Sequence, residues 1–294
     1  MAVTVGIDVG SVAVKVLVAA DGRPVCWLEE PTRPDISAQC EALLAQARGH
    51  GGREGRAAAV CATGYGRNLA TAARAHVSEI MANAVGAAWL WRHWDGLAEI
   101  FGEAPRPERA AGRFRTIVDV GGQDSKVITF DADGMISDFV MNDRCAAGTG
   151  RFLEVMARVL EVDLKRLDGL AMSARKAAGI SSTCTVFAES EVVSLLAEGA
   201  GKEAVAAGVF ESVAEQVAGL AARAGCQAPV LFDGGPSHSR ALRAALGRRL
   251  GTEPAVPPCG QFATALGAAL LAAEGSYEKG RLLRRRSGVP PQVG

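Results

Sequence analysis

The stretch IVDVGGQDSK at residues 117–126 has a counterpart near the N-terminus, GIDVGSVAVK at residues 6–15. In both copies an apolar run ends in Asp-Val-Gly, and a lysine follows that glycine after four intervening residues. Two apolar runs joined by a tight glycine turn are typical of a β-hairpin. A repeated hairpin indicates two related structural units in one chain. The sequence therefore predicts two similar α/β domains that face each other.

The turns of both hairpins have the composition of phosphate-binding loops. Glycine allows the backbone to approach a phosphate closely, and consecutive backbone N–H groups can hold its oxygens. A serine hydroxyl adds a hydrogen-bond donor, and lysine side chains can neutralise phosphate charge. We therefore predict nucleotide contacts from Gly10, Ser11, Lys15, Gly121, Gly122 and Lys126.

Three carboxylates close to these turns are candidates for catalysis. Asp8 and Asp119 stand near the ends of the first strands of the two hairpins. Carboxylates in such positions can hold the waters of a Mg²⁺ ion or orient the water that attacks the phosphate. Asp124 is equally eligible, so the residues alone leave the choice among the three open.

A third glycine loop, DGGPS at residues 233–237, follows a short apolar strand at residues 230–232. Gly234 and Gly235 would let an adenosine lie flat on the backbone. The Walker A pattern does not occur in the sequence, which excludes a P-loop ATPase. The two hairpin turns and this late glycine loop together predict a site for ATP or ADP with Mg²⁺.

The repeat also sets the expected domain boundaries. Residues 1–114 together with 262–294 should form the first domain, and residues 115–261 the second, with the nucleotide cleft between them. Apolar periodicity predicts helices at residues 37–48, 78–92, 149–160, 203–224, 239–250 and 261–274. The last of these helices would close the fold.

Residues 89–113 differ in amino-acid composition from the rest of the chain. They contain three tryptophans, two prolines and clustered charged residues, and we interpret them as an irregular insertion. We expect Trp89, Trp91 and Trp94 to form a local hydrophobic patch that covers the insertion. A docking surface for a partner is the alternative, because tryptophan is enriched at interface hot spots.

Two cysteines stand close to predicted helix starts: Cys145 precedes the helix at residues 149–160, and Cys184 precedes a further predicted helix that contains the apolar pairs 186–187, 192–193 and 195–196. Unpaired N–H groups at a helix N-terminus stabilise a thiolate, which is the form that ligates metal. Two thiolates are half of what an iron–sulfur cluster with four cysteine ligands needs, and a symmetric dimer would supply the other half. Buried structural thiols are one alternative interpretation, and a cluster held within one chain with the help of Cys61 or Cys259 is another.

The composition limits the classes of function. The chain has 294 residues, 49% of them hydrophobic, and a formal net charge of zero, so we expect neither a nucleic acid nor a membrane as partner. We find no uncharged apolar run near the roughly 18 residues of a membrane helix. An odd number of cysteines, seven, argues against a disulfide framework. We therefore expect a cytoplasmic protein.

The order of these motifs resembles the superfamily of actin, heat-shock chaperones and the sugar and acetate kinases. Within it, residues 119–126, 142–151 and 181–191 resemble the BadF/BadG/BcrA/BcrD ATPase family. That family comprises activators of 2-hydroxyacyl-CoA dehydratases and ATP-binding subunits of benzoyl-CoA reductases. The resemblance covers nearly the whole chain and implies an actin-like ATPase fold with two βββαβα-type domains. It also implies that Gln123 takes part at the phosphates.

The same resemblance implies a [4Fe–4S] cluster that bridges two subunits through Cys145 and Cys184 of each, in a homodimer or a heterodimer of related chains. ATP hydrolysis would then drive a low-potential electron into a partner acyl-CoA dehydratase, with ferredoxin or flavodoxin as the electron donor. An integral ATP-binding subunit of a benzoyl-CoA reductase, an aromatic acyl-CoA reductase, is the alternative. A small-molecule kinase or an actin-like assembly protein of the same fold is a more distant one.

Overall fold

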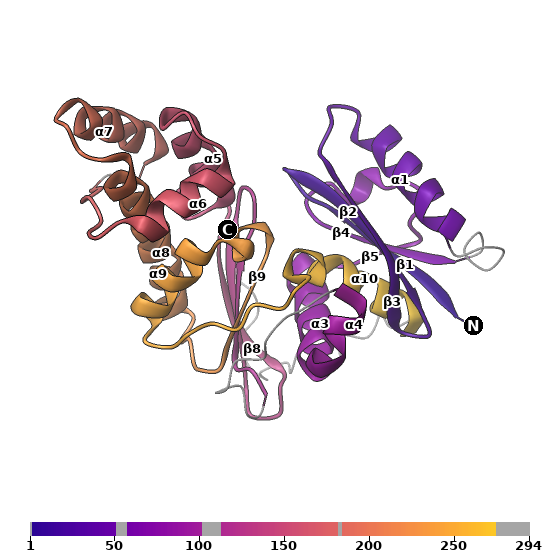
Figure 1. The fold of residues 1–294 in the computed structure, drawn as a ribbon. Helices are drawn as coiled ribbons and strands as arrows, with labels where there is room; N and C mark the ends of the chain where they lie inside the picture. Colours follow the sequence, from indigo (N-terminus) through magenta and orange to yellow (C-terminus); the bar gives the residue numbers. More distant parts are fainter. Residues whose placement is uncertain (1, 51–57, 102–112, 182–183, 275–294) are drawn as a thin grey trace, which may run out of the picture.

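The computed structural model describes residues 2–50, 58–101, 113–181 and 184–274, which form two lobes (Figure 1). Each lobe is built on one mixed sheet in which the first three strands are antiparallel and the fourth lies parallel to the first. Both sheets share the strand order third-second-first-fourth, and the first sheet has one further short strand. The predicted repeat is thus confirmed in the topology.

The first lobe has the sheet order β3-β2-β1-β4-β5 with helices on both faces. Helix α1 (Ile36–His50) covers one face, where it meets alternate residues of the first strand such as Val5 and Ile7. Helix α10 covers the other face, and α3 packs against α10. The remaining elements are β1 (Val3–Val9), β2 (Ala13–Ala20), β3 (Arg23–Pro31), β4 (Ala59–Thr63), η1 (Arg67–Leu69), β5 (Ala75–His76), α3 (Glu79–Arg92), η2 (Trp94–Gly96), α4 (Leu97–Phe101) and α10 (Ala263–Glu274).

The second lobe has the sheet order β8-β7-β6-β9, and its helices lie on one face of that sheet (Figure 1). Val118, Val120 and Val127 of the sheet belong to the same buried cluster as the helices. The elements are β6 (Thr116–Val120), β7 (Ser125–Phe130), β8 (Ile136–Asn142), α5 (Gly150–Val159), α6 (Leu164–Ser173), α7 (Thr185–Ala197), α8 (Lys202–Arg223), β9 (Val230–Asp233), η3 (Gly235–His238), α9 (Arg240–Leu250) and η4 (Gly260–Phe262).

Helices α3 and α10 approach each other closely because small residues line their contact. A Cβ atom added to Gly86 would lie 1.8 Å from the carbonyl oxygen of Ala263, and one added to Gly267 would lie 1.7 Å from that of Ala82. No side chain fits at such distances, so glycine is required at both positions. The alanine-rich composition of these helices therefore lets them pack backbone against backbone beneath β1.

The tryptophans lie in regular structure and not in an irregular segment. The prediction of an insertion from residue 89 was wrong for its first part, because helix α3 continues to Arg92 and is followed by η2 and α4. Trp91 and Trp94 are buried and pack with Phe114 and Leu231 between the second sheet and α3. Residues 102–112 of the expected insertion lie outside the described residues, and the domain boundaries stay a prediction.

Helix α8 is long and apolar enough to cross a membrane by length and composition alone. It is instead the central helix of the second lobe, where it contacts α5, α6, α7 and α9. Its valines Val209, Val213 and Val217 are fully buried. These contacts give α8 the surroundings of a core helix in a soluble fold.

Candidate functional site

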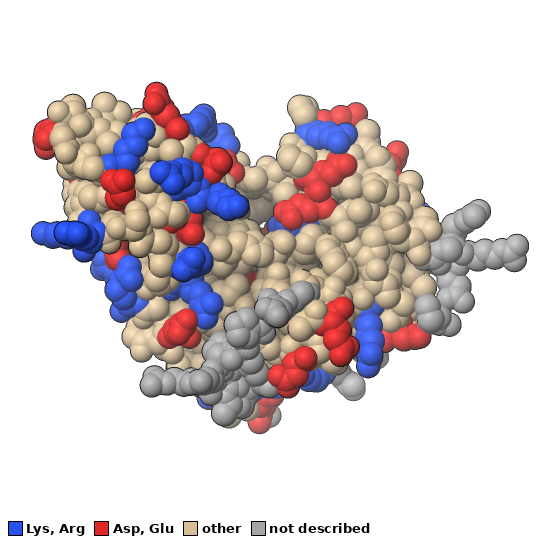
Figure 2. Space-filling model, viewed as in Figure 1, with Lys and Arg blue, Asp and Glu red and all other residues tan. Residues whose placement is uncertain are grey.

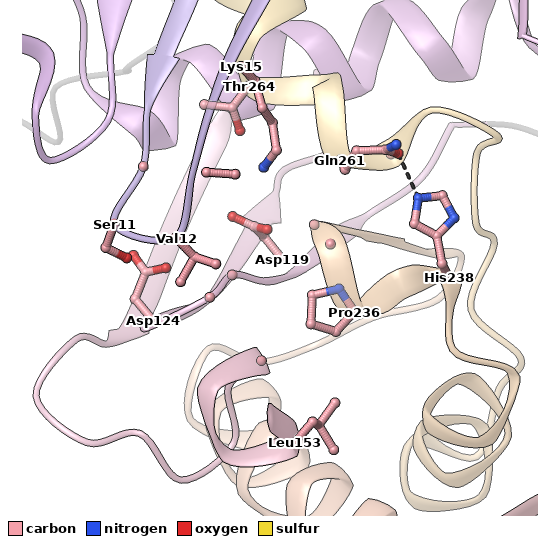
Figure 3. A pocket seen from close by; sticks show the side chains of 18 of the residues that line it. Ser11, Val12, Lys15, Asp119, Asp124, Leu153, Pro236, His238, Gln261 and Thr264 are labelled. Atoms are coloured by element: carbon pink, nitrogen blue, oxygen red, sulfur yellow. Dashed lines mark hydrogen bonds between the residues drawn. The ribbon is translucent and has the colours of Figure 1, made fainter. Parts of the chain in front are cut away.

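A cavity of about 530 Å³ lies between the lobes, at the hollow that the space-filling view shows between them (Figure 2). Both hairpin turns and the third glycine loop line it (Figure 3). The structure thus brings together at one cleft the predicted residues Asp8, Gly10, Ser11, Lys15, Asp119, Gly121, Gly122, Asp124, Lys126, Gly234 and Gly235. Gln123 is the exception, because it is exposed and does not line this cavity.

The two hairpin turns have the same backbone geometry. The N–H of Gly10 donates to the carbonyl of Ala13 at 3.1 Å, and the N–H of Gly121 donates to that of Asp124 at 2.8 Å. In each hairpin the strand register places the aspartate opposite the lysine. The tips also meet across the cleft, since a Cβ added to Gly122 would lie 2.3 Å from the Val12 side chain.

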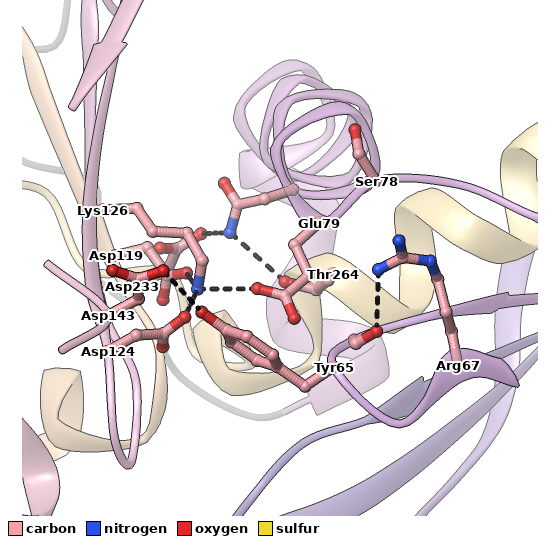
Figure 4. A network of polar contacts seen from close by, with 12 residues as sticks. Tyr65, Arg67, Ser78, Glu79, Asp119, Asp124, Lys126, Asp143, Asp233 and Thr264 are labelled. Carbon is pink, nitrogen blue, oxygen red and sulfur yellow. Dashed lines mark hydrogen bonds and ion pairs between the residues drawn. The ribbon is translucent and has the colours of Figure 1, made fainter. Parts of the chain in front are cut away.

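Lys126 is the centre of a buried ion cluster that spans both lobes (Figure 4). Its Nζ lies 2.7 Å from Asp124, 2.9 Å from Glu79 and 3.4 Å from Asp119. Burial alone would lower the pKa of Lys126, but the three carboxylates outweigh it and raise that pKa well above its usual value. Glu79 begins α3, so this ion pair joins the first lobe to the second.

Several carboxyl groups in the cleft or behind its lining are held in a poorly solvated position. Burial raises the pKa of Asp8, and the lysines Lys15 and Lys126 only partly offset this effect. Burial and then the charge of Asp119 raise the pKa of Asp233 well above its usual range. Oδ1 of Asp233 and Oγ1 of Thr63 are buried and have no hydrogen-bond partner within the described residues. Carboxylates that line the cavity, such as Asp8 and Asp119, would hold a hydrated divalent cation through its waters.

Asp233→Asn is expected to make stability less dependent on pH. A carboxyl with a raised folded pKa stabilises the fold below its unfolded pKa, about 3.9, and this contribution disappears as the pH rises through the folded value. The asparagine side chain does not titrate, so the variant should become more stable relative to wild type as the pH rises from about 4 through the folded pKa of Asp233. Urea unfolding at several pH values measures this difference; a gap that stays constant with pH would contradict it.

The third glycine loop is held in place by neighbouring elements of the second lobe. Gly234 has φ +83°, and a Cβ there would lie 2.1 Å from the carbonyl oxygen of Val120. Just beyond this loop, Asp168 of α6 accepts hydrogen bonds from the Ser239 hydroxyl and from the backbone N–H of Ala241. The side chains of His238 and Gln261 are joined at 2.8 Å across the rim of the cavity (Figure 3).

The sequence reasoning missed two polar residues of α3. Glu79 follows the N-cap Ser78 and reaches Lys126, and Asn83 donates to Asp233 at 3.0 Å and to Thr264 at 3.4 Å. A signal for them existed, because the predicted helix start at Ser78 is confirmed and Glu79 is its first residue. The four-residue spacing also places Glu79 and Asn83 on one face of the helix.

Cys145 and Cys184 are both exposed, whereas Cys40, Cys61 and Cys259 are buried. Cys184 is the N-cap of α7, as the sequence predicted. Cys145 lies in the loop between β8 and α5, and α5 begins at Gly150, within one residue of the predicted start at residue 149. Gly148, with φ +82°, gives the loop its turn just before the helix.

The start of helix α5 is fastened to the second hairpin turn. The backbone N–H groups of Gly150 and Arg151 donate to the carbonyls of Gly121 and Gly122 at 2.9 and 2.8 Å. These are N–H groups of a first helical turn, which have no partner within the helix itself. The predicted phosphate turn and the helix that follows Cys145 are therefore one hydrogen-bonded unit.

Residues 108–272 match the sequence profile of the BadF/BadG/BcrA/BcrD ATPase family. The chain is 40% identical over 279 residues to the (R)-2-hydroxyglutaryl-CoA dehydratase activating ATPase of Acidaminococcus fermentans, covering 92% of this chain and 96% of that one. It is 28% identical over 284 residues to a subunit of the benzoyl-CoA reductase of Thauera aromatica, covering 92% and 93% of the two chains.

Two solved structures share the fold over nearly the whole chain. One is (R)-2-hydroxyglutaryl-CoA dehydratase component A of Acidaminococcus fermentans, with a TM-score of 0.82, 38% identity and coverage of 94% of this chain and 99% of that one. The other is the activator of the 2-hydroxyisocaproyl-CoA dehydratase from Clostridium difficile with bound ADPNP, with a TM-score of 0.79, 36% identity and coverage of 97% and 100%. The predicted actin-like ATPase fold is thereby confirmed.

Proposed function

Because the chain belongs to the BadF/BadG/BcrA/BcrD ATPase family, we propose that it hydrolyses ATP to inject a low-potential electron into a partner 2-hydroxyacyl-CoA dehydratase. The ADPNP bound in the Clostridium difficile relative supports the nucleotide half of this proposal. Identity of 40% to a dehydratase activating ATPase, against 28% to a component of a benzoyl-CoA reductase, favours an activator over a permanent reductase subunit.

The main structural support for this proposal is the set of hydrogen bonds between the second hairpin turn and α5. The first backbone N–H groups of α5, the helix that follows the exposed Cys145, donate to the carbonyls of Gly121 and Gly122. Helix α5 in turn packs against α7, whose N-cap is the exposed Cys184. A change in the phosphates bound at the turn would therefore be transmitted through α5 and α7 to both thiols.

The two thiols fit a cluster that is shared between two chains. Within the described part of one chain, no group of three or more His, Cys, Asp or Glu side chains is arranged to bind a metal ion directly, so we expect a second chain to supply the missing cluster ligands. Cys145 and Cys184 are exposed and can meet the same residues of a second copy. A bound [4Fe–4S] cluster would supply a one-electron carrier.

The cleft residues divide into three roles in this proposal. The turns at Gly10–Ser11 and Gly121–Gly122 hold the phosphates, and Lys15 and Lys126 balance their charge. The loop at Gly234–Gly235 accommodates adenosine. The remaining candidates are Asp8, Asp119, Asp124 and Gln123, which would hold the waters of Mg²⁺ or orient the attacking water.

The proposal includes a dimer, a redox partner and a location. A homodimer, or a heterodimer with a related chain, would present the cysteines of two copies to one cluster. A ferredoxin or flavodoxin would reduce it, and the dehydratase would receive the electron. These are soluble partners, and we place the protein in the cytoplasm with them.

Anaerobic iron and sulfide analysis of wild type, Cys145→Ser and Cys184→Ser tests the proposal. We expect about four irons per dimer in wild type and almost none in either variant, because each removes two of four ligands. Cys226→Ser serves as the matched control, since this thiol is half-buried and distant in sequence from both motifs. Its iron content should equal that of wild type. A wild type that stays free of iron after anaerobic reconstitution would overturn the proposal.

A further inference from the structure

The loop that carries Cys145, residues 143–149, is tied to the second lobe at its C-terminal end. The hydroxyl of Ser125 donates to the carbonyl of Gly148 at 2.6 Å, just before the bonds that fasten α5 to the hairpin turn. Within the loop, the Asn142 side chain donates to the carbonyls of Cys145 and Ala147 at 2.8 and 3.0 Å. The loop is therefore braced internally, so its N-terminal end and Cys145 should move together.

The N-terminal end of this loop is contacted from the first lobe. The hydroxyl of Tyr65 donates to Oδ2 of Asp143 at 3.4 Å, across the mouth of the cleft (Figure 4). Among the described residues, this is the only hydrogen bond that we find between the first lobe and residues 143–149. Tyr65 lines the nucleotide cleft and Asp143 precedes Cys145 by two residues, so the contact bridges the two sites.

Tyr65 is carried by a segment that cannot move independently of the first hairpin. The N–H of Gly66 donates to the carbonyl of Val9 at 3.0 Å, and Val9 directly precedes the turn at Gly10. Gly64 has φ +92°, and a Cβ there would lie 2.5 Å from the Val9 carbonyl oxygen. The Arg67 side chain donates back to the carbonyl of Gly64 at 3.2 Å. Tyr65 therefore follows the first hairpin turn as part of one rigid unit.

We propose that Tyr65 is a positioning residue that transmits the closure of the lobes to Cys145 through Asp143. At 3.4 Å the bond is longer than the 2.7–2.8 Å of an ordinary O–H···O bond, so a small approach of the lobes strengthens it and a small separation breaks it. This is a difference in contact free energy between open and closed states, which any coupling between sites requires. The inference rests on the proposed function, because it gives the position of a cluster ligand a dependence on nucleotide.

Nucleotide-dependent alkylation of the cluster-free full-length chain tests this coupling without using activity. The rate of maleimide labelling at Cys145 is measured by mass spectrometry with saturating ADP and with saturating ADPNP, so that altered affinity does not enter. In wild type the two rates at Cys145 should differ, and the contact of Tyr65 should contribute up to about fivefold of that difference, the factor that one ordinary hydrogen bond is worth. In Tyr65→Phe, which keeps the ring and removes the hydroxyl, the difference should shrink to the part that the hydrogen bonds between the hairpin turn and α5 transmit.

Cys184 and a double-variant cycle supply the controls. The ratio of the two rates at Cys184 should be the same in wild type and in Tyr65→Phe, because Tyr65 makes no hydrogen bond to the described residues around Cys184. Asp143→Ala should reproduce the effect of Tyr65→Phe, and the double variant should add nothing further. Two results would overturn the inference. One is a ratio of labelling rates at Cys145, with ADP and with ADPNP, that is near one in wild type. The other is a ratio that is unchanged in Tyr65→Phe.

The outcomes also separate this inference from the proposed function. Iron analysis of reconstituted wild type decides whether a cluster binds, whereas the labelling ratio is measured without one. An iron-free protein that still shows the Tyr65-dependent ratio would contradict the electron-transfer proposal and retain the mechanical coupling. A protein that binds iron but whose labelling ratio at Cys145 does not depend on Tyr65 would support the electron-transfer proposal and contradict the mechanical coupling.

Discussion

Lys126→Met is expected to lower the free energy of unfolding by about 3–5 kcal/mol at neutral pH, the usual loss when one partner of a buried ion cluster is removed. The Lys126 side chain is only 5% exposed, and its single positive charge is shared by Glu79, Asp119 and Asp124. Methionine fills a similar volume without charge, so three poorly solvated carboxylates would face one another. ATP hydrolysis should be lost as well, since the cluster lines the nucleotide cleft.

Chemical denaturation of Lys126→Met at several pH values measures this effect. Burial already raises the pKa values of Glu79 and Asp124, and Lys126 opposes this effect. Without the cation these two pKa values rise further in the folded protein, so protonation of Glu79 and Asp124 stabilises the variant as the pH falls. The loss should therefore be smaller at about pH 5 than at about pH 8. Lys15→Met is the matched control from the other copy of the repeat, because no ion pair is found for Lys15 among the described residues. An equal loss in both variants would show that the ion cluster is unimportant.

Asp119→Asn is expected to reduce kcat for ATP hydrolysis on the order of 10³-fold, the size of effect seen when one preorganised charge is removed from a transition state. Asp119 is paired in register with Lys126 on one side and with Asp233 on the other, and it lines the cleft. Asparagine keeps the shape but lacks the charge that would hold the waters of Mg²⁺ or orient the attacking water.

The same substitution should leave the fold intact. The charge of Asp119 raises the pKa values of Asp8 and Asp233, so its removal relieves repulsion among buried carboxyl groups. We therefore expect a free energy of unfolding no lower than that of wild type, together with the large loss in kcat. Asp138→Asn, an exposed position on β8 of the same sheet, is the control and should retain activity. A stable Asp119→Asn variant with normal kcat would remove this residue from the catalytic set.

The sequence predicted the parts of the site that lie on short, repeated stretches of chain. In both hairpins the Asp-Val-Gly pattern fixes the strand end and the turn, and the spacing to lysine fixes the register that pairs Asp8 with Lys15 and Asp119 with Lys126. The loop after β9 was predicted from two glycines that follow an apolar strand in the sequence. These features depend on local chemistry, so neighbouring residues were sufficient to predict them.

The remaining features depend on contacts between distant segments. The implied fold includes a third strand in each domain, but the residues of β3 were not identified, because Pro24 and Pro31 are poor strand residues. They are tolerated here because β3 is an edge strand. The role of Glu79 depends on how α3 is placed against β7, which its own sequence does not encode. Helix α6 was also missed, although Asp163 caps it by accepting from the N–H of Arg166.

Helix α10 completes the first lobe although it stands at the end of the described chain, after the whole second lobe. During synthesis, β1 and α3 leave the ribosome long before their covering helix does. At about 5–20 residues per second, the interval is on the order of ten seconds or more. During this interval, neither the sheet face around Gly6 nor the small-residue side of α3 is covered by α10. The second lobe, whose strands and helices are contiguous in sequence, can fold in that time and present Phe114 and Leu231 as a surface for Trp91. The nascent first lobe is therefore the part of this protein that depends most on chaperones, and a chain that stops before Ala263 should aggregate.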